Sequence, residues 1–212
     1  MKAPTSQSKI SLTALPGIAF GVEHWTEDAL GVYAQGYAGI PATISNVLGN
    51  EISFTRHQID LGIGVRGFKT LRASSSAWIA ASNLRIGIEQ VQEQRPAILL
   101  SRLLLAPGLK VGYETVIPSA SIWLRGTLGL AYPFFVRENP ADSGRPDNMF
   151  QGSAEFFACY YFSDDIGLVF STEVLVQSFQ HGGEATRAGG IENVAVDDHY
   201  LTSLLGLRFV TF

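Results

Sequence analysis

The sequence has no long apolar run. None of its 212 residues lies in a window of about 18 apolar residues, so no transmembrane helix can be read from it. It has a single cysteine, Cys159, which excludes an internal disulfide. Charged residues make up only 16 %, against about 25 % in an ordinary soluble domain. The net charge of -4 gives no basic surface, which argues against a nucleic-acid partner.

Helical periodicity is nearly absent as well, which argues against an α-helical fold. The sequence instead alternates with period two, the pattern of a β-strand with one apolar and one polar face. In QIDLGIGVRGFK (58–69), Ile59, Leu61 and Ile63 share one face, whereas Asp60 and Arg66 share the other. The same alternation predicts nine strands, at about 8–24, 29–41, 52–68, 77–90, 98–115, 119–136, 149–162, 165–179 and 198–212.

The connections between these strands differ in length. Residues 116–120 and 162–167 form short turns, whereas 137–148 and 180–198 are long, polar and rich in Gly or Pro. Because short and long connections alternate, we expect tight turns at one end of the fold and long loops at the other. No linker or break in composition divides the chain. We therefore predict one domain over residues 1–212, with 1–7 as a flexible N-terminal segment.

Two all-β architectures produce this alternation, and they differ in which face is outside. In a soluble sandwich the apolar faces meet and the polar faces are wet. In a membrane-spanning barrel the apolar face meets lipid and the polar face lines the lumen. Several predicted strands exceed the usual length of about 5–6 residues, which favours the barrel. Small residues on the polar face also suit a crowded interior. They include Gly62, Gly64, Gly87, Gly108, Gly112 and Gly129.

The charges of the polar face are balanced, five acids against five bases. The acids are Asp60, Glu89, Glu114, Glu155 and Glu173, and the bases are Arg66, Arg85, Arg102, Lys110 and Arg125. A buried ion needs a partner, because an unpaired buried charge is very costly. A balanced set is therefore typical of a closed, narrow lumen, and we predict that these ten side chains form a lumen charge network.

The whole chain resembles small bacterial outer-membrane β-barrels of the OmpA/OmpX type in its alternating strands, its turn and loop pattern and its last strand. In that family the last strand ends in an aromatic residue preceded by alternate apolar residues, and the assembly machinery reads it. Phe212, Val210 and Leu204 match this C-terminal assembly signal, whereas Arg208 departs from it. Aromatic residues near strand ends are candidates for the interface girdles. They are Trp25, Tyr113, Tyr132, Phe134, Phe150, Tyr160, Phe162 and Phe179.

The resemblance implies an all-β fold, a single antiparallel up-and-down transmembrane β-barrel of eight to ten strands. Barrels of this type have even strand numbers, and ten is slightly preferred because both chain ends should lie on the periplasmic side. The implied location is the bacterial outer membrane, and the implied partners are outer-membrane lipid and the assembly machinery.

Catalytic motifs are sparse. Asp198 and His199, at the loop end of the last strand, have the residue types of an outer-membrane hydrolase in which His acts as base and Asp activates water. His181, Glu184 and Asp197 form a weak metal-site pattern in a Gly-rich loop. Neither pattern is complete, so we expect no catalytic residues, no metal and no cofactor.

The preferred function is therefore structural, anchoring or adhesive rather than enzymatic. In this interpretation Glu/Arg pairs close the lumen, and the loops at 137–148 and 180–198 meet a protein partner. Three alternatives stay open: a narrow pore, an outer-membrane hydrolase and a soluble β-sandwich binding module.

Overall fold

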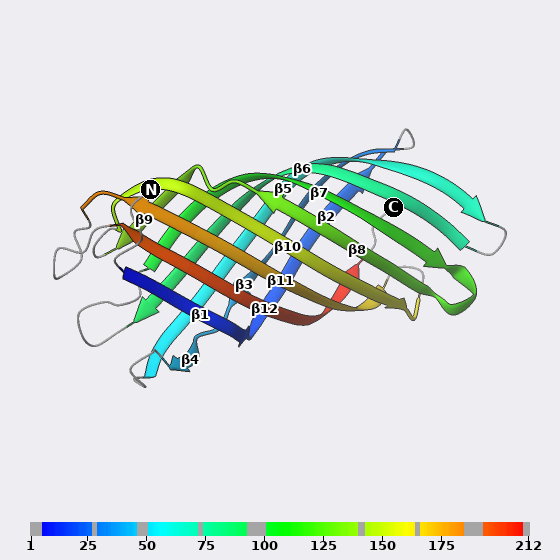
Figure 1. The fold of residues 1–212 in the computed structure, drawn as a ribbon. Coiled ribbons are helices and arrows are strands. Elements are labelled where there is room, and N and C mark those ends of the chain that lie inside the picture. Colours follow the sequence, from blue (N-terminus) through cyan, green and yellow to red (C-terminus); the bar gives the residue numbers. More distant parts are fainter. Residues whose placement is uncertain are drawn as a thin grey trace.

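A single 12-stranded sheet contains every strand that the computed structural model describes (Figure 1). The described residues are 6–26, 29–45, 51–71, 74–92, 101–139, 143–163, 166–184 and 193–209. The strands are β1 (Ser6–Leu15), β2 (Gly17–Trp25), β3 (Leu30–Gly39), β4 (Ala42–Ser45), β5 (Glu51–Leu71), β6 (Ser74–Gln92), β7 (Ser101–Ile117), β8 (Ile122–Ala131), β9 (Phe135–Asn139), β10 (Arg145–Tyr161), β11 (Ile166–Gly182) and β12 (Val194–Phe209). In these ranges no helix has the length and apolar character needed to cross a membrane.

The chain passes along the sheet nine times, as the alternation predicts. β3 and β4 both pair with β5, and β8 and β9 both pair with β7, so each of these two pairs is one interrupted pass. Only Pro16 separates β1 from β2. Because nine is odd, the first and last passes run in the same direction, and β1 pairs with β12 in parallel. The even number implied by the resemblance, and the preference for ten, are therefore wrong, although nine lies within the predicted range.

The connections lie at two distinct ends, as predicted. At the right-hand end in Figure 1, short connections join β2 to β3, β5 to β6, β7 to β8 and β10 to β11. We call this the short-turn end and the opposite one the long-loop end. At the long-loop end the strands extend further than predicted. The Arg145–Gly182 pair begins the ladder of β10 and β11, so strands take up parts of 137–148 and 180–198. Likewise β1 begins at Ser6, inside the predicted N-terminal segment.

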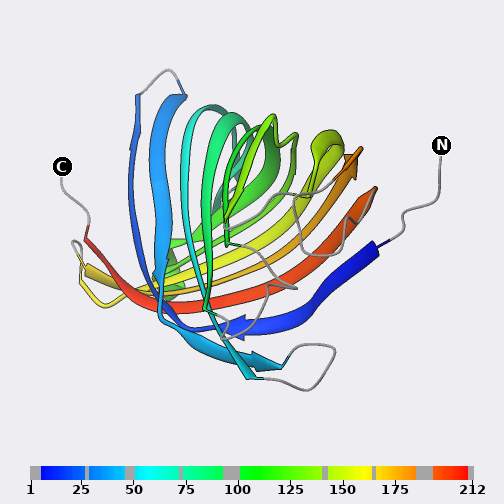
Figure 2. The ribbon, with the colours of Figure 1, turned by 90° about the vertical axis from the view of Figure 1, so that its left-hand side faces the viewer.

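The sheet curls around an interior (Figure 2). Buried charged and polar side chains face this interior, and large apolar side chains are exposed outside. On β5 Ile63 is 59 % exposed, whereas Asp60, which has the other parity on the same strand, is 1 % exposed. The interior is tightly packed at Gly62, because a Cβ added there would overlap the ring of Tyr33. A polar interior under an apolar exterior is the reverse of a soluble protein.

The two buried apolar clusters of the described residues lie in the half of the interior near the long-loop end, whereas Trp123 packs edge-on against Phe157 in the other half. One cluster contains Ile52, Phe54, Leu175 and Tyr200, and the other Leu104, Ala106, Met149, Phe179, Val194 and Val196. Phe179 is fully buried in the second cluster, so its assignment to an interface girdle is wrong. Trp25 also faces inward, with the guanidinium of Arg66 3.7 Å from its ring centroid.

Candidate functional site: a buried charge network

The ten residues of the predicted lumen network all lie on the inward face of the curled sheet. They come from β5, β6, β7, β8, β10 and β11, and each makes at least one ion pair. Alternation places them there: on each strand they share the parity that faces the interior. The network divides into a central group and one group toward each end.

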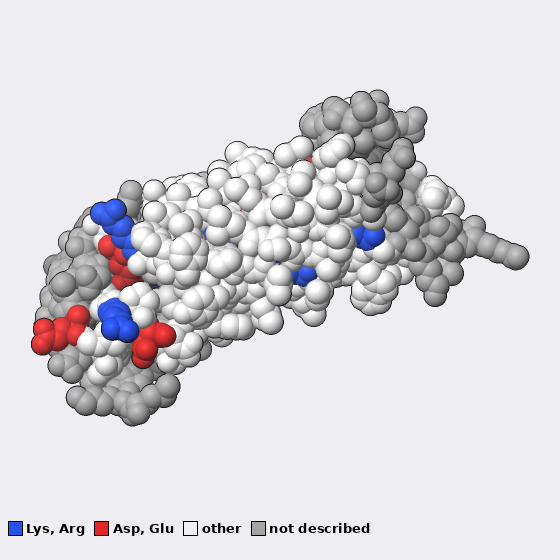
Figure 3. Space-filling model, turned by 90° about the horizontal axis from the view of Figure 1, so that it is seen from above, with Lys and Arg blue, Asp and Glu red and all other residues white. Residues whose placement is uncertain are grey.

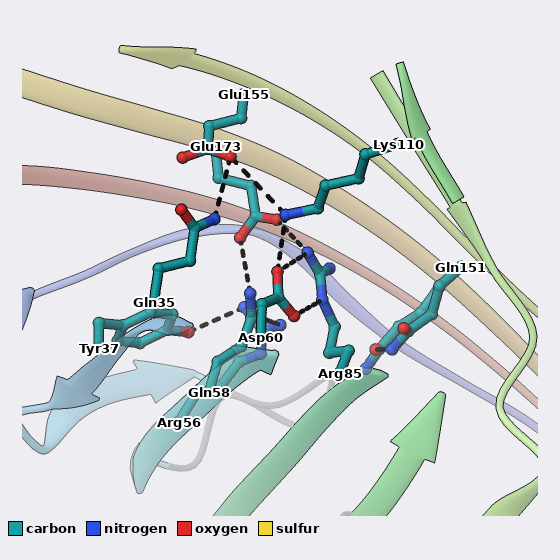
Figure 4. A network of polar contacts seen from close by, with 11 residues as sticks. Gln35, Tyr37, Arg56, Gln58, Asp60, Arg85, Lys110, Gln151, Glu155 and Glu173 are labelled. Atoms are coloured by element: carbon teal, nitrogen blue, oxygen red, sulfur yellow. Dashed lines mark hydrogen bonds and ion pairs between the residues drawn. The ribbon is translucent and has the colours of Figure 1, made fainter. Parts of the chain in front are cut away.

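Asp60 is the centre of the middle group (Figure 4). Its carboxylate accepts two hydrogen bonds from Arg85, at 2.9 and 3.0 Å, and one from Lys110 Nζ at 2.8 Å. Arg85 also reaches across the interior to Glu173, with Nη2 and Oε1 2.6 Å apart. Lys110 Nζ lies 3.9 Å from Glu155. These contacts join β5, β6 and β7 to β10 and β11 on the opposite wall, so side chains cross the middle of the interior.

Glu89 is the centre of the group toward the long-loop end. Arg102 Nε lies 3.1 Å from its carboxylate, and Arg102 Nη2 lies 2.6 Å from Asp198 Oδ2. Gln177 donates a hydrogen bond of 2.7 Å to Glu89 from the opposite wall. Arg56 lies 3.8 Å from Glu89 and places its guanidinium 4.6 Å from the ring centroid of Tyr200. Two carboxylates and two guanidiniums thus balance each other beside the apolar clusters.

Glu114 is the centre of the group toward the short-turn end. Arg66 Nε lies 2.8 Å and Arg125 Nε 3.2 Å from its carboxylate, and the indole of Trp123 donates a third contact at 3.2 Å. Arg125 also donates two hydrogen bonds to Glu23 on β2, at 3.1 and 2.9 Å. This group therefore ties β2 to β5, β7 and β8.

Four residues that belong to the network were not among the ten predicted from the sequence: Glu23, Arg56, Gln177 and Asp198. Arg56 has the same parity as Asp60 on one strand, so extending the pattern toward the strand start finds it. Glu23 lies on the polar face of the first predicted strand, so its parity also identifies it as a candidate for the interior. The sequence places Asp198 only at the loop end of the last strand, and the three-dimensional structure shows that Arg102 holds it.

The Asp198–His199 pair does not converge on one site. Successive side chains of a strand point to opposite faces, so Asp198 is buried inside while His199 points outward. Within the part of the chain that the structure describes, no three His, Cys, Asp or Glu side chains lie close enough to hold a metal ion.

On the last strand, the exposed apolar residues have the opposite parity to the residues of the proposed assembly signal. Leu204 faces inward and lines a cavity, whereas Leu205 and Leu207 are exposed. Val210 and Phe212 lie outside the described residues. The parity read from the C-terminal Phe therefore does not hold at Leu204, because β12 places its even-numbered residues inside from Val194 to Leu204.

In chemical terms the network is a set of neutralised ions that cross-link opposite walls. Coulomb attraction in such a poorly hydrated interior is strong, and the hydrogen bonds satisfy groups that would be costly to bury alone. The all-strand, curled sheet, antiparallel except for the β1–β12 pair, is compatible with a β-barrel. No protein-family model matches this chain, and no curated protein or solved structure matches it either.

Proposed function

We propose that this protein is a bacterial outer-membrane β-barrel that acts as a closed anchor. One observation carries the proposal: the exposed face is apolar along the long strands, whereas the ionised side chains are buried and paired. In water such an arrangement exposes hydrocarbon and buries ions, both of which cost free energy. In a bilayer the same exterior meets lipid at no such cost.

Exposed aromatic residues at two levels support a membrane-spanning orientation. Tyr132, Phe134 and Phe150 lie toward the long-loop end, and Tyr160 and Phe162 toward the short-turn end. Ten residues separate Phe150 from Tyr160 on one strand, about 33 Å at the usual rise. A tilt of about 45° reduces this to about 23 Å, close to the roughly 25 Å apolar band of outer-membrane barrels.

The charged surface lies beyond this band. Figure 3 shows acidic and basic side chains gathered at the left-hand end, which is the long-loop end, while only a few basic atoms are visible among the white residues along the middle of that face. Arg137, Arg145, Asp147 and Glu184 are exposed there. This end therefore has the charge that a protein partner in water would recognise, and we assign the adhesive or anchoring contact to it.

Folding in detergent is the direct test of the membrane assignment. Protein diluted from denaturant into detergent micelles is expected to gain a sheet signal in far-UV circular dichroism and to migrate differently on a gel when unboiled. Dilution into plain buffer is expected to give neither, because the apolar exterior has no partner there. Cooperative folding to a monomer in plain buffer would instead support the soluble alternative.

Conductance separates the closed anchor from a pore. The folded wild-type protein is expected to give no discrete current steps in planar bilayers, since Asp60, Arg85, Lys110 and Glu173 span the interior. Replacing all four with Ala removes two acids and two bases, so no net charge is left behind. We expect this variant to conduct if it retains the gel shift. Steps in the wild-type protein would contradict the closed anchor and favour the narrow pore.

A further inference from the structure

The wall of the barrel-like sheet has a seam where the first pass changes partner. β1 follows β12 as far as the Leu15–Thr202 pair, and Pro16 comes next. Proline has no N–H to donate to a ladder, so it ends this pairing. β2 then pairs with β3, starting at Gly17–Gly39. Among the described residues, β2 pairs with β3 alone, and β12 beyond Thr202 pairs with β11 alone.

β2 and the end of β12 diverge from this point, as Figures 1 and 2 both show. A cavity of about 520 Å³ lies at the seam. Inward-facing residues such as Tyr33, Glu155 and Leu204 line its inner part. Its lining also includes Phe20 on β2 and Leu207 on β12, which point outward and are 50 % and 60 % exposed. Because inward and outward side chains line one space, the cavity passes through the wall.

The inner part of the cavity contains more negative than positive charge. Three carboxylates line it, those of Glu23, Glu155 and Glu173, against one guanidinium, that of Arg125. Arg125 holds Glu23 with two hydrogen bonds, and Arg85 lies 2.6 Å from Glu173. The third carboxylate, that of Glu155, has weaker partners.

The Glu155 carboxylate can therefore accept further hydrogen bonds. Its nearest cation, Lys110 Nζ, is 3.9 Å away and already lies 2.8 Å from Asp60, and Gln35 donates to it at 3.4 Å (Figure 4). Its side chain is 20 % exposed, whereas that of Lys110 is 8 % exposed. The hydroxyl of Tyr33, in the same cavity, is buried and makes no hydrogen bond to any residue that the structure describes.

We propose that the seam is a binding site for an amphiphile with one apolar chain and an ammonium headgroup, which enters laterally from the membrane. The apolar chain lies between Phe20 and Leu207, and the ammonium donates hydrogen bonds to the Glu155 carboxylate and the Tyr33 hydroxyl. This inference rests on the proposed membrane location, since only lipid supplies the seam with apolar chains. A free long-chain amine and an ethanolamine lipid share the required chemistry.

Native mass spectrometry of the detergent-folded protein tests the proposal with dodecylamine, dodecanoate and dodecanol as probes. The unboiled gel shift is checked first, so that a failure of folding is assigned to the proposed membrane location and not to this site. Dodecylamine is expected to bind one per protein, at least about tenfold more tightly than either other probe, as one charge-assisted hydrogen bond provides. Lysophosphatidylethanolamine, run in parallel, shows whether a lipid headgroup also fits.

Three variants locate the site. Glu155→Gln keeps the shape and removes the charge, so dodecylamine binding should fall about tenfold. Gly206→Phe should abolish binding, because Gly206 lines the cavity and a Cβ there meets nothing within 4 Å. Gly126→Phe is the matched control, also in open space but on the outward face of β8, and should bind normally. Equal binding of the three dodecyl probes, or unchanged binding in Gly206→Phe, would overturn the proposal.

Discussion

Asp60→Ala is expected to lower the free energy of unfolding by about 3–5 kcal/mol, the usual cost of breaking a buried ion pair from one side. Asp60 accepts hydrogen bonds from both Arg85 and Lys110, and all three side chains are buried. Without the carboxylate, Arg85 keeps Glu173, but Lys110 keeps only Glu155 at 3.9 Å. One buried positive charge is then left in excess. Urea titration in detergent micelles, followed by tryptophan fluorescence, measures the loss.

Two further variants show that charge, not lost volume, causes this effect. Asn83→Ala truncates a buried, uncharged side chain on the same inward face, and should cost about 1 kcal/mol. Asp60→Ala combined with Lys110→Met removes the surplus positive charge and should recover more than half of the loss. If Asp60→Ala costs no more than Asn83→Ala, the network does not hold the barrel together.

Ile63→Arg is expected to destabilise the folded protein in lipid vesicles by about 2–4 kcal/mol, the cost of a cation on the lipid face near the bilayer midplane. Ile63 is 59 % exposed and lies in the middle of the outward face of β5. In a soluble protein such an exposed position accepts a charge within about 0.5 kcal/mol. The substitution therefore distinguishes an exterior in lipid from one in water. Urea titration of vesicle-folded protein gives the difference.

Asn148→Arg is the matched control for this substitution. Asn148 is also exposed, but it lies on β10 near the long-loop end, beyond the aromatic level of Phe150. It should change the free energy of unfolding by no more than about 1 kcal/mol, because charge near the interface costs little. Equal effects at the two positions would show that no apolar solvent surrounds the middle of the barrel.

Local alternation was enough to predict the nine passes, the two kinds of end and the inward position of the charges. Side chains of a strand alternate strictly, so one charged residue such as Asp60 sets the parity of its whole strand. The same rule places Arg85 and Lys110 on the inward faces of the neighbouring strands. Which acid meets which base across the interior does not follow from any one strand, since it depends on registers between distant strands.

Phe179 and Leu204 show where local reasoning failed. Both were read from their positions near a strand end, yet Phe179 is buried in an apolar cluster and Leu204 lines the seam cavity. Phe179 shares the parity of Glu173 on β11, and Leu204 shares that of Asp198 on β12, so the alternation of each strand places both side chains inside. A one-residue error in parity moves every side chain of a strand to the other face.

The amino-acid sequence by itself determined the class of this protein. Period-two alternation with few charges specifies long strands with one apolar and one polar face, because successive side chains of a strand point to opposite sides. Only the tertiary structure determined how the first and last passes of the sheet come together. The parallel pairing of β1 with β12, the seam beyond Pro16 and the cross-interior ion pairs all depend on how an odd number of passes brings the two ends of the chain together. Contacts between residues so far apart in sequence leave no local pattern to read.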